Sequence, residues 1–435
     1  MAARRRQRGT ATGWFWISLL WTVFVIYGSL VPLNYQPLPF AEAWREFQDV
    51  RLFDLRLGAR ADWVANGVLF SGITFLWSAA FAHPGAVMRV IVAAVLFLLS
   101  AMVAVALEFT QVYFPGRTVS LNDVYAEIIG GGGGVLAWLL FGARFQTLFN
   151  AHNGTASSAI SAGIVLYSLV YVVLNLFPFD FVVSVEELQT RAERRPAGLL
   201  FASTGCQRLS RCAITTIFEI VAVVPLGIGL ALLVSAGRRL SKRRVFTLGV
   251  TIGMMLEAIQ FLTYSGTSQG FSVLLRGVGL VAGAELGHWL RSQPRERLAS
   301  LLRPALFATI PLYVIVLMIG NRWSLRAPSN IGEVVARIQE LSFIPFEYHY
   351  FNREAMAVQK ILYHATMAGP AGVYLWTLVS PSSSLHRPAM AALIGAVLAL
   401  VFGVGRLFVG VGAPDPTNLL VGALAATAGF LFAGY

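Results

Sequence analysis

Apolar residues gather along this chain in twelve long runs that are separated by polar connections. Each run comes close to the roughly 17–25 residues that an α-helix needs to cross a bilayer. The runs lie at residues 14–31, 64–81, 87–109, 124–141, 159–179, 213–234, 246–263, 271–290, 304–320, 361–378, 389–411 and 418–432. The pattern predicts an all-α, polytopic membrane protein with about twelve transmembrane helices.

The connections between these runs follow a period of four. Long connections follow the first, fifth and ninth runs, at 32–62, 180–212 and 321–360, and short ones follow the third, seventh and eleventh. A fixed period indicates repeated structural units. Because four spans return the chain to the same side of the membrane, the copies would be parallel repeats. The sequence therefore predicts three four-helix units, at 1–150, 151–298 and 299–435.

Local sequence supports the same division. LEFTQ at 107–111 recurs as LEAIQ at 256–260, at the end of a run in both units. The other matching sets are Gly130 and Gly134 with Gly279 and Gly283, Asn66 with Glu219 and His364, and Asp123 before Gly130 with Asp415 before Gly422.

Each long connection also contains an amphipathic segment. Apolar residues recur at helical spacing at Trp44, Phe47 and Val50, more weakly at Val185 and Leu188, and again at Ile331, Val334, Val335, Ile338 and Leu341. We expect these segments to be helices that lie on the membrane surface. The alternative is that they are loops packed on the helix bundle.

Composition and charge place the chain in a membrane. It is 57% hydrophobic and 12% charged, whereas a soluble domain carries about 25% charged residues. The net charge of +12 comes from basic residues that flank apolar runs, so the bilayer is the expected partner and nucleic acid is not. Among the short connections on one side, Arg117 is the only basic residue, and the other side is rich in arginine. The positive-inside rule then predicts cytoplasmic termini and extracytoplasmic long connections.

Polar residues of the first unit are concentrated where its helices should end on the outer side. Glu108 and Gln111 share one helical face, and Asp123 and Glu127 share another. Charge within apolar sequence is costly, so it indicates a functional site. The candidate ligand-binding residues are Asp62, Asn66, Glu108, Gln111, Arg117, Asp123 and Glu127. The alternative is that these groups pair only to hold the helices together.

These residues resemble the motif of the VanZ-like family of bacterial membrane proteins. The resemblance rests on Ser29-Leu30-Val31-Pro32, Asp62, Asn66, Phe70, Glu108-x-x-Gln111, Arg117, Ser120, Asp123, Gly130 and Gly134. The family usually has Asn where this chain has Glu127. The second unit keeps Pro178, Glu257 and Gln260 but has Gly266 and Ser272 in place of Arg117 and Asp123, and the third keeps His364, Asp415 and Gly422.

The resemblance implies a protein of the bacterial inner membrane and cell envelope. The family is associated with low-level resistance to teicoplanin, a glycopeptide that acts on cell-wall precursors outside the membrane. It supplies no reaction and no cofactor.

Three functions are compatible with these residues. The chain could bind a lipid-linked or glycan-bearing envelope molecule at its outer face, with Arg117 meeting an anionic group and Gln111 and Asp123 orienting polar ones. It could be a secondary transporter, although that would need polar groups near the midplane, where only Glu219 and Glu285 qualify. It could be a membrane enzyme that uses Glu108 or Asp123 as general acid or base.

Several other features have structural interpretations. The glycines at 130–134 indicate close helix packing rather than a phosphate loop, because no Lys-Ser or Lys-Thr follows them. Glu186-Glu187-x-x-x-Arg191 matches the acid motif of intramembrane proteases but lies in a polar connection. HExxH is absent and His364 has no second ligand at i+4, so no metal site is predicted.

Two pairings are predicted in the second unit. Arg276 aligns with Glu127, so Glu257 and Arg276 should form an ion pair that makes this copy mainly structural. Cys206 and Cys212 fall in an outward connection, where a disulfide is permitted but not required.

Overall fold

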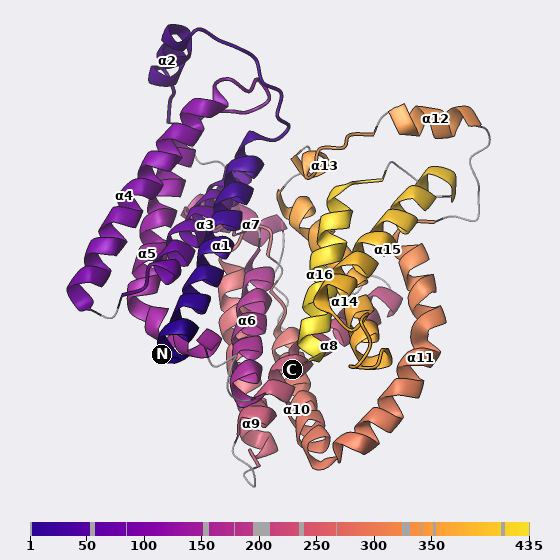
Figure 1. Ribbon diagram of the computed structural model, residues 1–435. Coiled ribbons are helices and arrows are strands. Elements are labelled where there is room, and N and C mark those ends of the chain that lie inside the picture. The colour runs from indigo at the N-terminus through magenta and orange to yellow at the C-terminus, as the bar shows by residue number, and fades with distance from the viewer. Residues whose placement is uncertain are drawn as a thin grey trace. The chain divides into compact units, whose positions relative to one another are not determined.

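The computed structural model is built from α-helices (Figure 1) and describes residues 2–52, 57–83, 85–150, 156–177, 179–194, 209–234, 239–266, 268–323, 331–339, 341–350, 354–409 and 414–434. Within those ranges the regular structure is helical, apart from a few isolated bridge residues such as the antiparallel pair Phe181 and Thr263. The prediction of an all-α fold is confirmed.

Each predicted apolar run lies within or overlaps a long helix. These helices are α1 (Ala2–Leu30), α3 (Leu57–Ala80), α4 (Ala86–Gln111), α5 (Leu121–Asn150), α6 (Ala156–Leu176), α8 (Leu209–Leu233), α9 (Lys242–Phe261), α10 (Gly270–Ser292), α11 (Arg295–Gly320), α14 (Glu354–Leu378), α15 (Pro388–Val409) and α16 (Thr417–Ala433). In the described part of the chain, nine of these helices are long and apolar enough to cross a membrane. The remaining three, α6, α14 and α16, do not meet both criteria. The chain is therefore a polytopic membrane protein, and a total of twelve spans stays a prediction.

The amphipathic segments of the long connections are helices, as predicted. They form α2 (Phe40–Gln48), α7 (Val185–Arg194) and α12 (Ile331–Gln339), and a fourth short helix, α13 (Glu347–Tyr350), follows α12. The rings of Phe40, Trp44 and Phe47 on α2 pack around Phe109 near the end of α4. Trp44 remains 45% exposed and Ile331 on α12 is 82% exposed, so apolar surface is left for a membrane.

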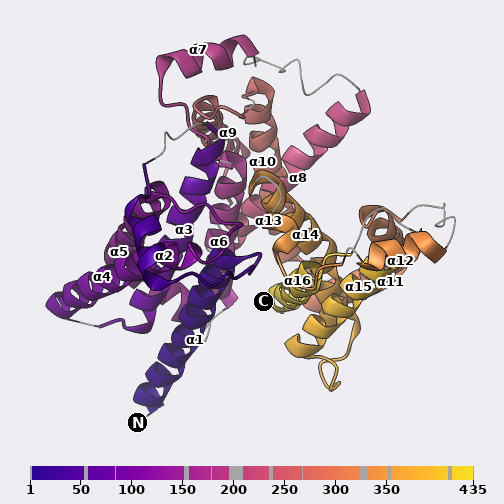
Figure 2. The ribbon, with the colours of Figure 1, turned by 90° about the horizontal axis from the view of Figure 1, so that it is seen from above.

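The helices divide into two compact parts, Met1–His288 and Trp289–Tyr435. The first part holds α1 to α10, in which α1, α3, α4 and α5 run alongside one another (Figure 1). In the second part, α14, α15 and α16 pack together in both views (Figure 1, Figure 2). The boundary that the sequence places at residue 150 lies inside the first part and stays a prediction.

Small residues let the second and fourth helices of each predicted unit approach closely. A methyl group at Gly130 of α5 would overlap the backbone of Gly67 on α3. The same holds for Gly283 of α10 against Val224 on α8, and for Gly429 of α16 against Gly369 on α14. The glycines at 130–134 thus lie inside a helix, and Gly130 and Gly134 pack closely against α3, as the sequence analysis predicts.

One turn recurs after the first helix of every unit. Leu33, Phe179 and Arg322 have positive φ angles of 63°, 62° and 56°. Their amide groups donate to the carbonyls of Leu30, Leu176 and Ile319, near the ends of α1, α6 and α11. Residues other than glycine rarely adopt a positive φ angle. The recurrence of this conformation at matching positions therefore supports the three-unit interpretation.

Candidate functional site

The acids predicted in the first unit are buried where α4 ends and α5 begins. Glu108 is 1% exposed, Glu127 2% and Gln111 3%. Ser120, just before α5, donates its backbone N–H to Glu108 Oε2 at 3.2 Å. Within the described residues Glu127 Oε2 is buried and has no hydrogen-bond partner. The end of this hairpin therefore holds a cluster of buried polar groups within apolar helices.

Asp123 is held on both carboxylate oxygens. Ser120 Oγ donates to Oδ2 at 2.6 Å, and Asn66 Nδ2 on α3 donates to Oδ1 at 3.0 Å. Ser120 Oγ also accepts from the Asp123 amide at 3.2 Å, which satisfies one of the donors that a helix start leaves unpaired. Asp123 thus joins the second helix of the unit to the fourth.

Arg117 lies in the turn between α4 and α5. Its Nη1 donates to the Val31 carbonyl at 3.5 Å, and its charge attracts Glu108 and Glu127, whereas that of the exposed Asp62 repels them. All seven residues predicted for this site therefore lie at one end of the first unit.

The second unit repeats this framework with different charges. Gln269 donates its backbone N–H to Glu257 Oε2 at 2.6 Å. This bond matches the one from Ser120 to Glu108, because in both units the donor lies twelve residues after the glutamate. Arg276 Nη1 lies 2.7 Å from Glu257 Oε1, so the expected ion pair is present. Arg276 also donates to Tyr171 Oη at 3.1 Å and to Asn175 Oδ1 at 3.2 Å.

Two further contacts of the second unit match the first. Ser272 Oγ donates to Glu219 Oε1 at 2.9 Å, at the positions that Asp123 and Asn66 occupy. Arg191 of α7 donates to the carbonyls of Gln260 and Gly266 at 3.2 and 3.1 Å. The guanidinium of Arg191 therefore reaches the turn in which Gly266 stands at the position of Arg117. Comparison of the repeats in sequence does not predict this arginine, because Arg191 belongs to α7 and not to the turn itself.

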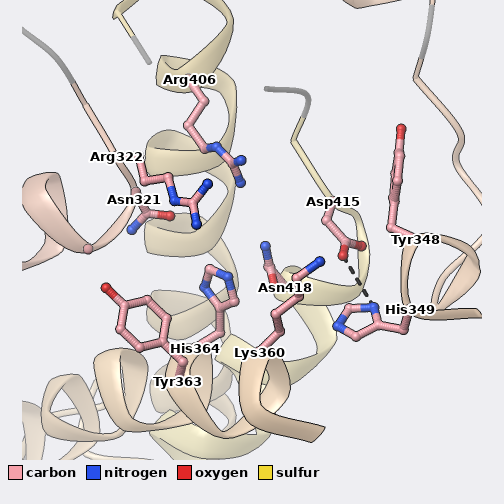
Figure 3. Close-up of a pocket in the computed structure, with 11 residues that line it drawn as sticks. Asn321, Arg322, Tyr348, His349, Lys360, Tyr363, His364, Arg406, Asp415 and Asn418 are labelled. Carbon is pink, nitrogen blue, oxygen red and sulfur yellow. Dashed lines mark ion pairs between the residues drawn. The ribbon is translucent and has the colours of Figure 1, made fainter. Parts of the chain in front are cut away.

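The third unit contains a cavity of about 280 Å³ that the sequence analysis did not predict. Its lining residues come from α13, from the ends of α11 and α15, from the first half of α14 and from the start of α16 (Figure 3). They are Gly320, Asn321, Arg322, Tyr348, His349, Lys360, Tyr363, His364, Arg406, Asp415 and Asn418. His364 and Asp415 are among the residues compared between units above, whereas the three cations, Arg322, Lys360 and Arg406, belong to no motif.

Comparison with known proteins identifies the first unit. Residues 14–142 match the model of the VanZ/LLP1 family. This part of the chain is thus similar to the VanZ-like family. No curated protein and no solved structure matches the chain.

The VanZ-like match covers the whole first-unit cluster, from Asp62 to Glu127. Of the remaining predictions, the disulfide cannot be followed, because Cys206 and the side chain of Cys212 lie outside the described residues. Among the residues that are described, no three His, Cys, Asp or Glu side chains gather as a metal site.

Proposed function

We propose that this VanZ-like protein binds the polar part of a lipid-linked or glycan-bearing envelope molecule at its outer face. The observation that carries the proposal is the pair of buried carboxyl groups, Glu108 and Glu127, beside Arg117 at the ends of membrane helices. An unpartnered oxygen in apolar surroundings is costly, and a hydroxyl or amide of a ligand would satisfy Glu127 Oε2.

The roles follow from the contacts. Arg117 would meet an anionic group, and Gln111, which is buried in the last turn of α4, would orient a polar group. Asp123 is fixed by Asn66 and Ser120, so it would present a rigid acceptor edge. Asp62 is exposed at the start of α3 and would face the solvent side of the ligand.

The proposal includes an orientation in the bacterial plasma membrane. Basic residues of the short connections favour cytoplasmic termini. The ends of α4 and α15 and the starts of α5 and α16 are then extracytoplasmic, at the depth of the lipid headgroups.

Contacts at the site favour binding over the two alternatives. Asp123 would have to release two hydrogen bonds to act as a general base, and Glu108 would have to release the amide of Ser120. The deeper acids that a transport path would use are also engaged. Glu219 accepts from Ser272, and Glu285 lies 3.3 Å from Lys242 Nζ.

The test compares Arg117→Gln and Gln111→Ala with Arg45→Gln, which removes an exposed cation from α2. In cells that depend on the protein for teicoplanin tolerance, the two site variants should lose that tolerance and Arg45→Gln should retain it. Membrane abundance is measured in parallel by immunoblot. Site variants that are abundant and still protective contradict the proposal, and site variants that vanish from the membrane show that the cluster is structural.

A further inference from the structure

The cavity of the third unit differs in charge from the first-unit cluster. Its lining has three cations, Arg322, Lys360 and Arg406, against a single carboxylate, Asp415. Figure 3 shows the guanidinium groups of Arg322 and Arg406 turned toward the space that the His364 ring also faces. Ligand pockets of about 300–1,000 Å³ hold drug-sized molecules, so 280 Å³ suits a small charged group.

Asp415 directs its carboxylate away from that space. Oδ1 accepts from the Thr417 amide at 2.9 Å, at the start of α16, and Oδ2 lies 3.3 Å from His349 Nδ1. The acid therefore positions the helix start and the imidazole, and the overall charge of the lining stays positive.

Buried polar groups complete the cavity. His349 is 7% exposed, and its Nε2 has no hydrogen-bond partner among the described residues. Asn418 and Asn321 are 8% and 9% exposed, and Asn321 Nδ2 donates to the Leu317 carbonyl at 2.9 Å. A buried polar atom without a partner is unfavourable, and Figure 3 shows His349 pointing this nitrogen toward Asn418 and Lys360.

We propose that this cavity is a second ligand site, which binds a phosphate group through Arg322, Lys360 and Arg406, with His349 and Asn418 as further polar contacts. Guanidinium groups match the geometry of phosphate oxygens, and such bonds are stronger than neutral ones. The third unit has lost the Glu and Gln of the first. It nevertheless gathers three cations and two imidazoles in one cavity, and charge among membrane helices is costly unless it serves a function.

Either a lipid headgroup or a free phosphate ester could supply the phosphate, because the cavity lies at helix ends. Two experiments on the purified full chain separate these sources. In the first, inorganic phosphate is added to protein in phosphatidylcholine nanodiscs, with chloride at equal ionic strength as the control. In the second, native mass spectrometry counts the phosphatidylglycerol molecules that protein from mixed bilayers retains.

The variants are Arg322→Gln with Arg406→Gln as a pair, and Lys360→Gln alone. Arg387→Gln is the matched control. Arg387 is exposed and directly precedes the first residue of α15, at the end of that helix opposite to Arg406. For a free phosphate, the wild type and Arg387→Gln should bind at least about tenfold more tightly than the double variant, a loss typical of charge-assisted bonds. For a lipid, the double variant should retain one phosphatidylglycerol fewer.

If the double variant does not purify as a monodisperse protein, Lys360→Gln tests the phosphate site in its place. Lys360 is exposed, so its substitution should leave the fold intact. Equal phosphate binding and equal lipid retention by the wild type and the cavity variants would overturn the proposal.

Discussion

At the scale of single residues, the first two units share one backbone hydrogen bond to a buried glutamate but differ in the charge that faces it. Glu108 and Glu257 each accept a backbone N–H from the residue twelve positions later. In the first unit the position that faces this glutamate across the hairpin holds another acid, Glu127, whereas the aligned position of the second unit holds Arg276. The second copy is thereby neutralised internally, whereas the first keeps two buried carboxyl groups without such a counter-ion contact, as the proposed binding site requires.

The second-unit pair should behave as one energetic element. Removing either charge leaves the other buried, which typically costs about 3–5 kcal/mol. We therefore expect Glu257→Gln and Arg276→Gln each to lower the midpoint of thermal unfolding in detergent by a large amount. The double variant should lose clearly less than the sum of the two. Additive losses would mean that the two groups act independently.

Glu127 should respond in the opposite sense. It lies near Glu108 and lacks a partner for Oε2 within the described residues. Because Glu127→Gln removes a repulsive neighbour and can donate a hydrogen bond, its unfolding midpoint should equal or exceed that of the wild type. A marked drop in the same detergent assay would show that the Glu127 carboxyl has a stabilising partner.

At the scale of helices, close approach through glycine sets the geometry of each unit. A methyl group at Gly130 or Gly134 would overlap the backbone of α3, whereas one at Gly133 meets nothing within 4 Å. Gly130→Ala should therefore reduce membrane abundance and thermal stability. Gly133→Ala, in the same helix, should be neutral or stabilising, since alanine is favoured over glycine by up to about 1 kcal/mol. Equal effects of the two substitutions would contradict this packing.

Hydropathy predicted the helices because the bilayer imposes a length on every span. It also predicted α2, α7 and α12, since an amphipathic period is visible in sequence. The third-unit cavity could not be predicted, because Arg322, Lys360 and Arg406 lie at the ends of different helices. Each alone looks like a topology signal, and only the packing of α11, α14, α15 and α16 brings them together.

At the scale of the whole molecule, an ion pair links the first two predicted units. Arg60 near the start of α3 contacts Glu187 of α7 at 2.7 Å and donates to the Phe181 carbonyl at 2.9 Å. The hydrogen bond from Arg60 lowers the pKa of Glu187 to about 2. This contact agrees with the grouping of α1 to α10 in one compact part.

The pH dependence of α7 follows from that pKa. Glu187 has a lower pKa when folded than when unfolded, so its contribution is complete above about pH 4.5 and is lost as pH falls toward 2. Hydrogen exchange should show α7 losing protection across that range. Glu187→Gln should reduce the protection of α7 already at pH 7 and remove the dependence. Unchanged protection in the variant would show that α7 is held by other contacts.

Topology can be tested on the whole chain. In a background with Cys206→Ser and Cys212→Ser, single cysteines at Arg239 and at Gln339, both exposed, should react with an impermeant maleimide from opposite sides. Gln339→Cys should react in intact cells and Arg239→Cys only after lysis. Labelling of both from one side would overturn the predicted orientation of α9 and α12.

The bond from residue 120 to Glu108, and from residue 269 to Glu257, uses the main chain as donor. A backbone donor survives almost any substitution, so Ser120 and Gln269 could drift apart in identity while the contact persisted. For this contact the identity of the glutamate therefore matters more than that of its donor, although Ser120 has a separate role through its hydroxyl, which bonds Asp123. Evolutionary searches for further copies of this hairpin should accordingly give weight to the acid and the twelve-residue interval, and leave the donor position open to every residue except proline.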